Sequence, residues 1–191
     1  APLNVVEAVL TYDTLLELTT ALEDAGVVVR ELITSGTPSF PDAIAYAPFE
    51  AMEDCVHRVS PGTVVLADTR THEQIPELDL DPAAVVRTRV VSHPGDDLIT
   101  CDAGSKSLAA ECGDPCAYVS GHPELVAQTP SEEHLPLRVT EGERPPRGTL
   151  LLLIPKHVCP TVNLADEAVL IDGGDYTVVP IAARGHELLV R

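Results

Sequence analysis

The chain has 191 residues, a length that suits one domain or one domain and a fragment. Its composition, with 45% apolar and 22% charged residues, is that of a globular protein and argues against disorder. Acidic residues outnumber basic ones by 30 to 12, and the net charge of −18 argues against a nucleic-acid partner or an anionic membrane surface. No apolar run reaches the roughly 20 residues that a membrane-spanning helix needs.

The first third of the chain has the pattern of an α/β structure. Apolar residues recur with helical spacing over residues 12–25. A β-branched strand is expected over residues 27–33, followed by a loop of small residues at 35–39. A short helix over residues 50–59 and a second buried strand over residues 63–67 would complete a strand–loop–helix–strand order, which is typical of a parallel sheet.

The rest of the chain is predicted to be mainly β. Six further strands are expected, at residues 85–92, 98–101, 135–139, 149–154, 168–171 and 176–181. The last two flank Asp172-Gly173-Gly174-Asp175, which is typical of a hairpin turn. We therefore predict an α+β chain with two domains, residues 1–75 and residues 76–191.

Cysteine and lysine are the rare residues that bear on chemistry. The five cysteines have irregular spacing and an odd count, which favours reduced thiols in a cytoplasmic protein over a disulfide framework. Lys106 and Lys156 are the two lysines of the chain, so any chemistry that needs a lysine amine has two candidates.

The most specific motif follows the strand predicted at residues 149–154. His157 and Cys159 are two residues apart, and in an extended segment their side chains would point to the same side. Imidazole and thiolate together suit Zn²⁺, and two protein ligands leave positions open for water or substrate. On spacing alone, the alternative is a half-buried histidine beside an inert, buried cysteine.

Each of the remaining motifs has a functional and a structural interpretation. Residues 35–39, Ser-Gly-Thr-Pro-Ser, leave a strand at its carboxyl end and could cradle a phosphate or form an ordinary loop. Glu133 and His134 could perform acid–base chemistry or belong to a solvated loop. Cys112 and Cys116 are interpreted as loop thiols, because no second cysteine pair lies near them in the sequence to complete a metal site.

In this order the motifs resemble one family, namely the carboxy-terminal half of the metal-activated pyridoxal-phosphate enzymes that include D-serine dehydratase and D-threonine aldolase. The resemblance covers about residues 27–172 and is most specific at residues 157–163. Residues 35–39 match the family's phosphate-binding loop, and residues 61–68 match its last barrel strand. Two further family signatures match residues 102–106 and 131–134.

The resemblance implies an alanine-racemase-like (fold type III) architecture. The last βα units of a (β/α)8 barrel, residues 1–75, would precede a mainly antiparallel β domain that carries the metal motif. Ser35, Gly36 and Thr37 would bind the phosphate of pyridoxal phosphate, and His157 and Cys159 would bind Zn²⁺.

The expected departure from the family is the missing Schiff-base lysine. In the family this lysine lies in the amino-terminal part of the barrel, which we expect to be absent from this chain. Lys106 lies in a β-domain signature and Lys156 adjoins the metal motif, so neither matches the Schiff-base position.

The implied function is part of a D-serine-dehydratase-like lyase. In the family, a cysteine two residues after the metal-binding histidine resembles the dehydratases, whereas an aspartate there resembles the aldolases. Such an enzyme eliminates water from a D-3-hydroxy amino acid and releases ammonia, and the complete protein is expected to be a homodimer. The alternatives are a D-threonine-aldolase-like or racemase-like enzyme, or a non-catalytic metal-binding or assembly module because the lysine region is missing.

Overall fold

A computed structural model of the chain describes residues 5–185 and divides into two compact units. The first unit holds the residues up to Val65 together with Thr71–Leu80. The second unit holds Leu66–Arg70 and the residues from Asp81 onward. The second unit therefore takes in a short segment of chain that precedes its main body in the sequence.

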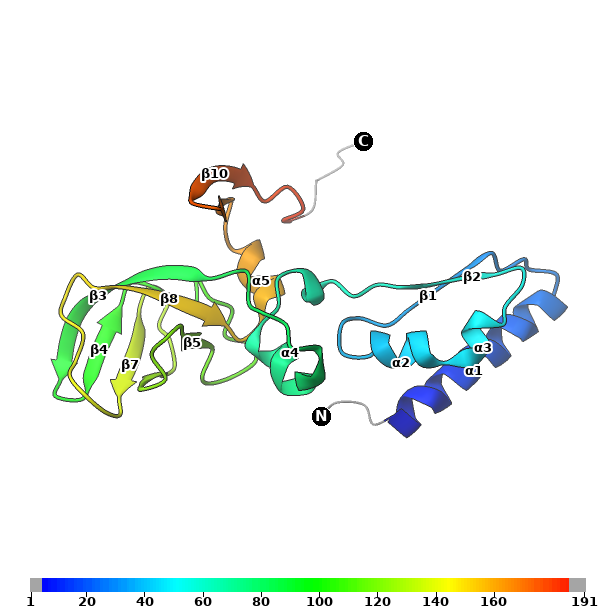
Figure 1. Cartoon of the computed structure of the whole chain (residues 1–191), viewed down its shortest axis with the longest axis horizontal. Helices are drawn as coiled ribbons and strands as arrows, with labels where there is room; N and C mark the ends of the chain where they lie inside the picture. The colour runs from blue at the N-terminus through cyan, green and yellow to red at the C-terminus, as the bar shows by residue number, and fades with distance from the viewer. Residues whose placement is uncertain (1–4, 186–191) are drawn as a thin grey trace. The chain divides into compact units, whose positions relative to one another are not determined.

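The first unit contains a two-stranded parallel sheet and helices (Figure 1). Strand β1 (Glu31–Thr34) pairs in parallel with β2 (Val56–Val59). The helices and helical turns of this part of the chain are α1 (Val5–Asp24), α2 (Phe40–Ala45), α3 (Ala47–Glu50), η1 (Thr63–Val65), α4 (Thr69–Gln74) and η2 (Pro76–Leu78). Among the described residues, none of the helices is long and apolar enough to cross a membrane.

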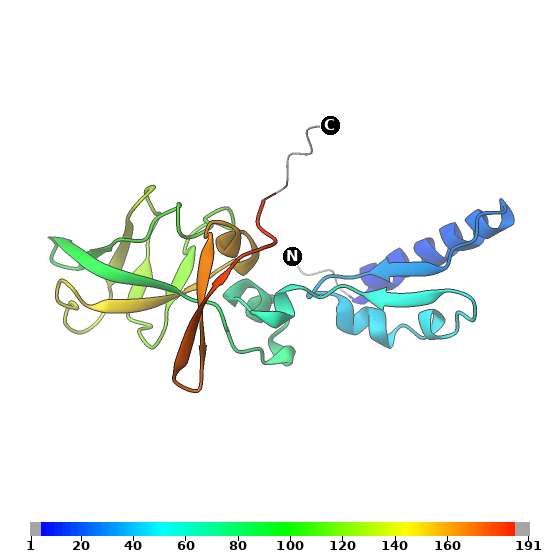
Figure 2. The ribbon, with the colours of Figure 1, turned by 90° about the horizontal axis from the view of Figure 1, so that it is seen from above.

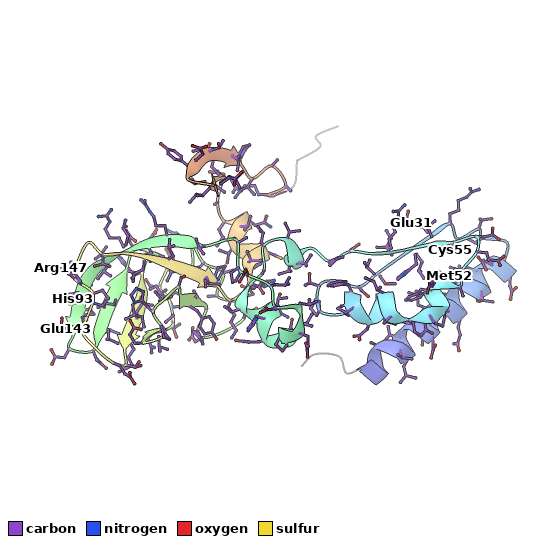
Figure 3. The ribbon with its side chains drawn as sticks, viewed as in Figure 1. Glu31, Met52, Cys55, His93, Glu143 and Arg147 are labelled. Carbon is purple, nitrogen blue, oxygen red and sulfur yellow. The ribbon has the colours of Figure 1, made fainter. Side chains whose placement is uncertain are left out.

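Aromatic rings form the centre of this first unit. The ring centroid of Phe49 lies 5.2 Å from that of Tyr12 and 4.9 Å from that of Tyr46. Phe49 also stacks on the imidazole of His57, with centroids 4.1 Å apart. Cys55, labelled in Figure 3, is buried in the same cluster. Tilted and stacked rings at these separations add stabilisation to the burial of their apolar area.

Two predictions for this unit are wrong. Residues 56–59 of the predicted helix 50–59 form strand β2, because the β-branched residues Val56 and Val59 lie beside β1 and complete its ladder. Residues 63–67, predicted as a buried strand, contain the 3₁₀ turn η1 instead, so residues 61–68 do not form the last barrel strand that the resemblance implied. The backbone N–H of Val65 donates to the carbonyl of Gly62, so the chain turns here rather than extending.

The second unit contains a closed barrel of six antiparallel strands in the order β3-β4-β7-β6-β5-β8. The strands are β3 (Val86–Gly95), β4 (Leu98–Cys101), β5 (Ala117–Val119), β6 (Leu125–Ala127), β7 (Leu135–Val139) and β8 (Leu150–Pro155). Alternate residues point inward, and Ile99, Leu135, Leu137 and Leu153 have no exposed surface. At one end of the barrel, labelled in Figure 3, His93 of β3 hydrogen-bonds to the carbonyl of Pro145 across 2.8 Å.

The chain leaves the barrel through helix α5 (Val158–Asn163), which a buried carboxylate positions. Asp68 is 1% exposed, and its Oδ2 accepts a hydrogen bond of 2.9 Å from the backbone N–H of Val158. The backbone N–H of Arg70 donates to the carbonyl of Lys156. Residues 68–70 therefore hold the chain on both sides of His157.

A β-hairpin follows α5, as the Asp-Gly-Gly-Asp turn predicts (Figure 2). Strand β9 (Glu167–Asp172) pairs antiparallel with β10 (Asp175–Pro180). Gly173 and Gly174 both have positive φ, which glycine adopts without strain. Among the described strands these two pair only with each other, and every residue of β9 is exposed.

Replacing Gly104 with alanine is expected to destabilise the barrel unit by roughly 1–3 kcal/mol. A Cβ atom at this position would lie 2.4 Å from the backbone oxygen of Glu132 and 2.5 Å from that of Ser131, so backbone must move. The matched control is Gly95→Ala, where the nearest atom is the Cβ of Leu98 at 3.8 Å. Thermal unfolding followed by circular dichroism compares the two, and equal losses would contradict the close approach at Gly104.

Replacing Asp68 with alanine should cost about 2 kcal/mol of unfolding free energy, because the buried N–H of Val158 loses a charged acceptor. Asp68→Asn keeps an acceptor oxygen and should lose less. Asp97→Ala is the comparison for a surface carboxylate, since Asp97 pairs with Arg138 in solvent, where ion pairs contribute about 1 kcal/mol or less. Urea titrations of the three variants would contradict the assignment if Asp97→Ala proved the most damaging.

Candidate functional site

His157 lies at the junction of β8 and α5. It has extended backbone angles (φ −132°, ψ 107°) and is the residue that precedes the first turn of the helix. Cys159 is already helical, so the argument that both side chains share one side of an extended segment is wrong. Cys159 is exposed, whereas His157 is half-buried. The role of Cys159 as a metal ligand stays a prediction.

Two residues from a distant loop meet His157. A carboxylate oxygen of Glu111, the Sγ of Cys112 and a ring nitrogen of His157 all lie within 4.8 Å of one another. The Sγ of Cys112 is 3.6 Å from Nδ1 of His157 and 3.4 Å from Oε1 of Glu111. Nδ1 of His157 is also hydrogen-bonded to the Glu111 carboxylate. We call Glu111, Cys112 and His157 the Glu–Cys–His cluster.

The charges of the Glu–Cys–His cluster are coupled. Burial raises the pKa of Glu111, but hydrogen bonds from His157, from its own backbone and from Cys112 outweigh this and hold the pKa below its usual value. Burial and the neighbouring Glu111 carboxylate raise the pKa of the Cys112 thiol. The Arg70 guanidinium, whose Nη1 donates to Cys112 Sγ across 3.6 Å, acts in the opposite direction. Without a metal ion, Cys112 is therefore a protonated thiol at neutral pH.

A buried threonine ties the loop of Glu111 to the helix that follows His157. Oγ1 of Thr161 donates to the carbonyl of His157 across 2.8 Å and accepts from the backbone N–H of Ala109 across 3.1 Å. Leu108, the next residue back, is fully buried in the barrel core. Both segments of the cluster are thus fixed to one framework.

The predicted phosphate loop, residues 35–39, follows β1. Gly36 is exposed, and the backbone N–H groups of Ser35, Gly36 and Thr37 donate to no other described residue. Oγ of Ser35 is 2.9 Å from the hydroxyl of Tyr12, which also donates to the carbonyl of Ser39. Consecutive free N–H groups at the carboxyl end of a parallel strand can bind an anion.

Sequence reasoning missed a histidine in the same unit. Nε2 of His57 lies 2.8 Å from Oγ1 of Thr34, the last residue of β1. Burial lowers the pKa of His57, so its imidazole is neutral at physiological pH. Its position on β2 was hidden because residues 50–59 were predicted to be a helix.

The structure brings together the two signatures at residues 102–106 and 131–134. The backbone N–H groups of Ser105 and Lys106 donate to the carbonyls of Ser131 and Glu132. The Nζ of Lys106 pairs with Glu133 at 2.7 Å and with Glu132 at 3.3 Å. These carboxylates raise the pKa of Lys106, which keeps its amine protonated.

The remaining residues that the sequence singled out have different surroundings. Glu133 is engaged with Lys106, and the side chain of His134 is exposed. Cys116 is buried in the barrel core, as expected for an inert thiol. The sequence interpretation missed Cys112 and its neighbour Glu111, because His157, which both contact, lies 45 and 46 positions away along the chain.

Comparison with known proteins identifies relatives for most of the chain. A domain family described as "putative serine dehydratase domain" matches residues 83–171. The D-threonine aldolase of Arthrobacter sp. is 32% identical over 168 residues, which is 86% of this chain and 42% of that protein. The crystal structure of D-threonine aldolase from Filomicrobium marinum has a TM-score of 0.80 at 25% sequence identity. The match covers 94% of this chain and 47% of the aldolase chain.

A second group of solved structures shares the fold. D-threo-3-hydroxyaspartate dehydratase from Delftia sp. HT23 has a TM-score of 0.64 at 21% identity, and a cysteine-to-alanine mutant of such a dehydratase in the metal-free form has the same score at 20%. Both matches cover 88% of this chain and 48% of the dehydratase chain. The chain thus spans about half the length of these named enzymes. It belongs to the pyridoxal-phosphate family of D-serine dehydratase and D-threonine aldolase, with an alanine-racemase-like fold, and corresponds to the carboxy-terminal part of its members.

Proposed function

We propose that the chain is part of a pyridoxal-phosphate- and zinc-dependent lyase that acts on a D-3-hydroxy amino acid. The preferred reaction is dehydration, in which D-serine loses water and then releases ammonia to give pyruvate. The observation that carries the proposal is the position of His157, whose half-buried imidazole lies where β8 ends and among side chains of metal-ligand type.

The donor set around His157 fits a zinc ion. Imidazole nitrogen, thiolate sulfur and carboxylate oxygen are the three ligand types that Zn²⁺ takes in proteins. In this proposal His157 holds the metal, and Cys159 is its partner by resemblance to the family motif. The mixed nitrogen and sulfur set disfavours Mg²⁺ and Ca²⁺, which prefer oxygen ligands.

The loop at residues 35–39 fits a phosphate group. The N–H groups of Ser35 and Gly36, which donate to no other described residue, can each donate a hydrogen bond to a phosphate oxygen. Thr37 is included by resemblance to the family's loop, although it is 2% exposed in this structure. The buried Oγ1 of Thr37 already accepts from the backbone N–H of Val64, so this side chain stiffens the loop rather than facing a ligand. The hydroxyl of Tyr12, on helix α1, hydrogen-bonds to both Ser35 and Ser39 and so ties the two ends of the loop to the helix.

In this proposal the cofactor and the metal supply the chemistry, and the protein residues bind and orient them. When bound, pyridoxal phosphate takes up electrons as the Cα–H bond breaks, and Zn²⁺ makes the β-oxygen a better leaving group. The chain's own residues bind and orient: Ser35 to Thr37 fix the phosphate, and His157 fixes the metal. Lys106 cannot act as a nucleophile while it is protonated between Glu132 and Glu133.

D-Threonine aldolase activity is the second candidate. The D-threonine aldolase structure from Filomicrobium marinum has a TM-score of 0.80, against 0.64 to 0.67 for the structures of D-threo-3-hydroxyaspartate dehydratase. The cysteine at position 159 favours dehydration instead, by resemblance to the family motif. A non-catalytic metal-binding or assembly module is the alternative for a functional protein without a Schiff-base lysine.

The products distinguish these functions. The complete gene product, supplied with pyridoxal phosphate and Zn²⁺, should release pyruvate and ammonia from D-serine, and His157→Ala should abolish the release. Glycine and acetaldehyde from D-threonine without pyruvate would instead establish the aldolase. The 191-residue chain alone should form neither set of products, because by resemblance to the family neither Lys106 nor Lys156 is at the Schiff-base position. Turnover by this chain that Lys106→Ala or Lys156→Ala abolished would overturn that assignment.

Zinc affinity of the chain should fall as the pH is lowered from about 8 to about 6, because the imidazole and thiol must lose their protons to bind the ion. Competition with a chromophoric chelator measures the affinity at each pH. His157→Ala should weaken binding at least about tenfold. His134→Ala is the control, since this exposed histidine lies outside the Glu–Cys–His cluster. Equal affinity in both variants would contradict the assignment of His157.

A further inference from the structure

We infer that Cys112 and Glu111 join His157 as direct ligands of the metal ion, so that the centre is a three-ligand site for a borderline-soft divalent cation. The inference rests on the proposed function in one respect, that His157 binds the metal. It adds two ligands that the His-x-Cys motif does not contain, and it does not depend on Cys159.

Two of the three spacings in the Glu–Cys–His cluster match the edges of a zinc tetrahedron. With Zn–N and Zn–S bonds of roughly 2.0 and 2.3 Å, two tetrahedral ligands lie about 3.5 Å apart. The Sγ of Cys112 is 3.6 Å from Nδ1 of His157 and 3.4 Å from Oε1 of Glu111. The third pair, Glu111 with Nδ1 of His157, is in hydrogen-bond contact, so an ion between them would separate the two by replacing the Nδ1 proton.

The scaffold holds the ligands in place before any ion arrives. Asp68 fixes the start of α5, so His157 is held at the end of β8. Thr161 bonds to both the carbonyl of His157 and the N–H of Ala109, and this links the two ligand-bearing segments. On the loop itself, the N–H of Leu108 donates to the carbonyl of Gly104 and the N–H of Gly113 donates to that of Ala110. Ligand atoms that are already positioned cost less conformational entropy on binding.

The charges of the site favour a divalent ion. The Glu111 carboxylate and a Cys112 thiolate together carry two negative charges, which balance the charge of Zn²⁺. Arg70 is the cation that faces the thiol, and its hydrogen bond to Sγ is long at 3.6 Å. It stabilises the thiolate and leaves the other lone pairs of the sulfur available. Three protein ligands leave a fourth tetrahedral position for water or a substrate oxygen, which is the pattern of catalytic rather than structural zinc sites.

Cobalt substitution provides the test. Co²⁺ follows the ligand preferences of Zn²⁺, and a thiolate ligand gives it an intense charge-transfer absorption that reports sulfur coordination directly. The chain is titrated with Co²⁺ and then with Zn²⁺, as wild type and as Cys112→Ser, Glu111→Gln, Cys159→Ser and His157→Ala. Cys55→Ser, a thiol of the first unit that lies outside the cluster, is the control.

Cys112→Ser is expected to remove or reduce the charge-transfer band and to weaken Co²⁺ binding at least about tenfold. Glu111→Gln preserves the shape of the side chain and is expected to weaken binding while keeping the band, which separates a ligand role from misfolding. Circular dichroism of each variant verifies the fold. A band and an affinity unchanged from wild type in Cys112→Ser overturn the inference.

The variants also separate this inference from the proposed function. Loss of the band in Cys112→Ser but not in Cys159→Ser supports the three-ligand site and removes Cys159 as a ligand. Loss in Cys159→Ser alone supports the His157 and Cys159 site and overturns the inference. Partial loss in both variants supports a centre with two thiolates. Undiminished binding in His157→Ala overturns both proposals, as does a wild-type chain that binds neither ion.

Discussion

Asp68 accepts a hydrogen bond from the backbone N–H of Val158 at the point where β8 gives way to α5. This bond joins residues 90 positions apart, inside a part of the protein where an unpaired N–H would be costly. It fixes where the helix begins, and the start of the helix fixes His157. Thr161, one turn later, then ties the loop of Glu111 to the same helix. The geometry of the Glu–Cys–His cluster thus depends on the carboxylate of Asp68, which is not itself part of the cluster.

The barrel strands could be predicted where the local sequence has a clear strand pattern. Strands β4 and β7 begin and end where the alternation of apolar residues places them, and the hairpin turn at Gly173 and Gly174 was visible as two adjacent glycines. The three-residue strands β5 and β6 were missed, because segments this short carry no measurable period. In the first unit, a β-branched run beginning at Thr63 suggested a strand, but no partner strand pairs with it in the described chain, and it turns instead.

The site was predictable only in part. His157 was proposed because the motif around it is contiguous, and residues 35–39 were proposed as a phosphate loop because small residues follow a strand; both roles stay predictions. Glu111 and Cys112 were not proposed as part of the site, since their contacts with His157 join residues 46 and 45 apart. Such contacts are set by the barrel strands that lie between them and leave no trace in local spacing. The helical start at Val158 was hidden by the β-branched residues Val158, Thr161 and Val162, which favour strands when read without their tertiary partners.

The β9–β10 hairpin affects the tendency of the protein to aggregate in solution. A two-stranded sheet has no interior strand, so its outer backbone groups are open to pairing with another chain, and Ile171 and Tyr176 are 73% and 76% exposed beside them. Electrostatic repulsion opposes such pairing between chains. The hairpin carries the acidic residues Glu167, Asp172 and Asp175, and the whole chain has a net charge of −18. Near the isoelectric point of about 4.5 this repulsion disappears. The chain is therefore expected to be most prone to edge-to-edge aggregation in buffers near pH 4.5, and least prone where its net charge is large.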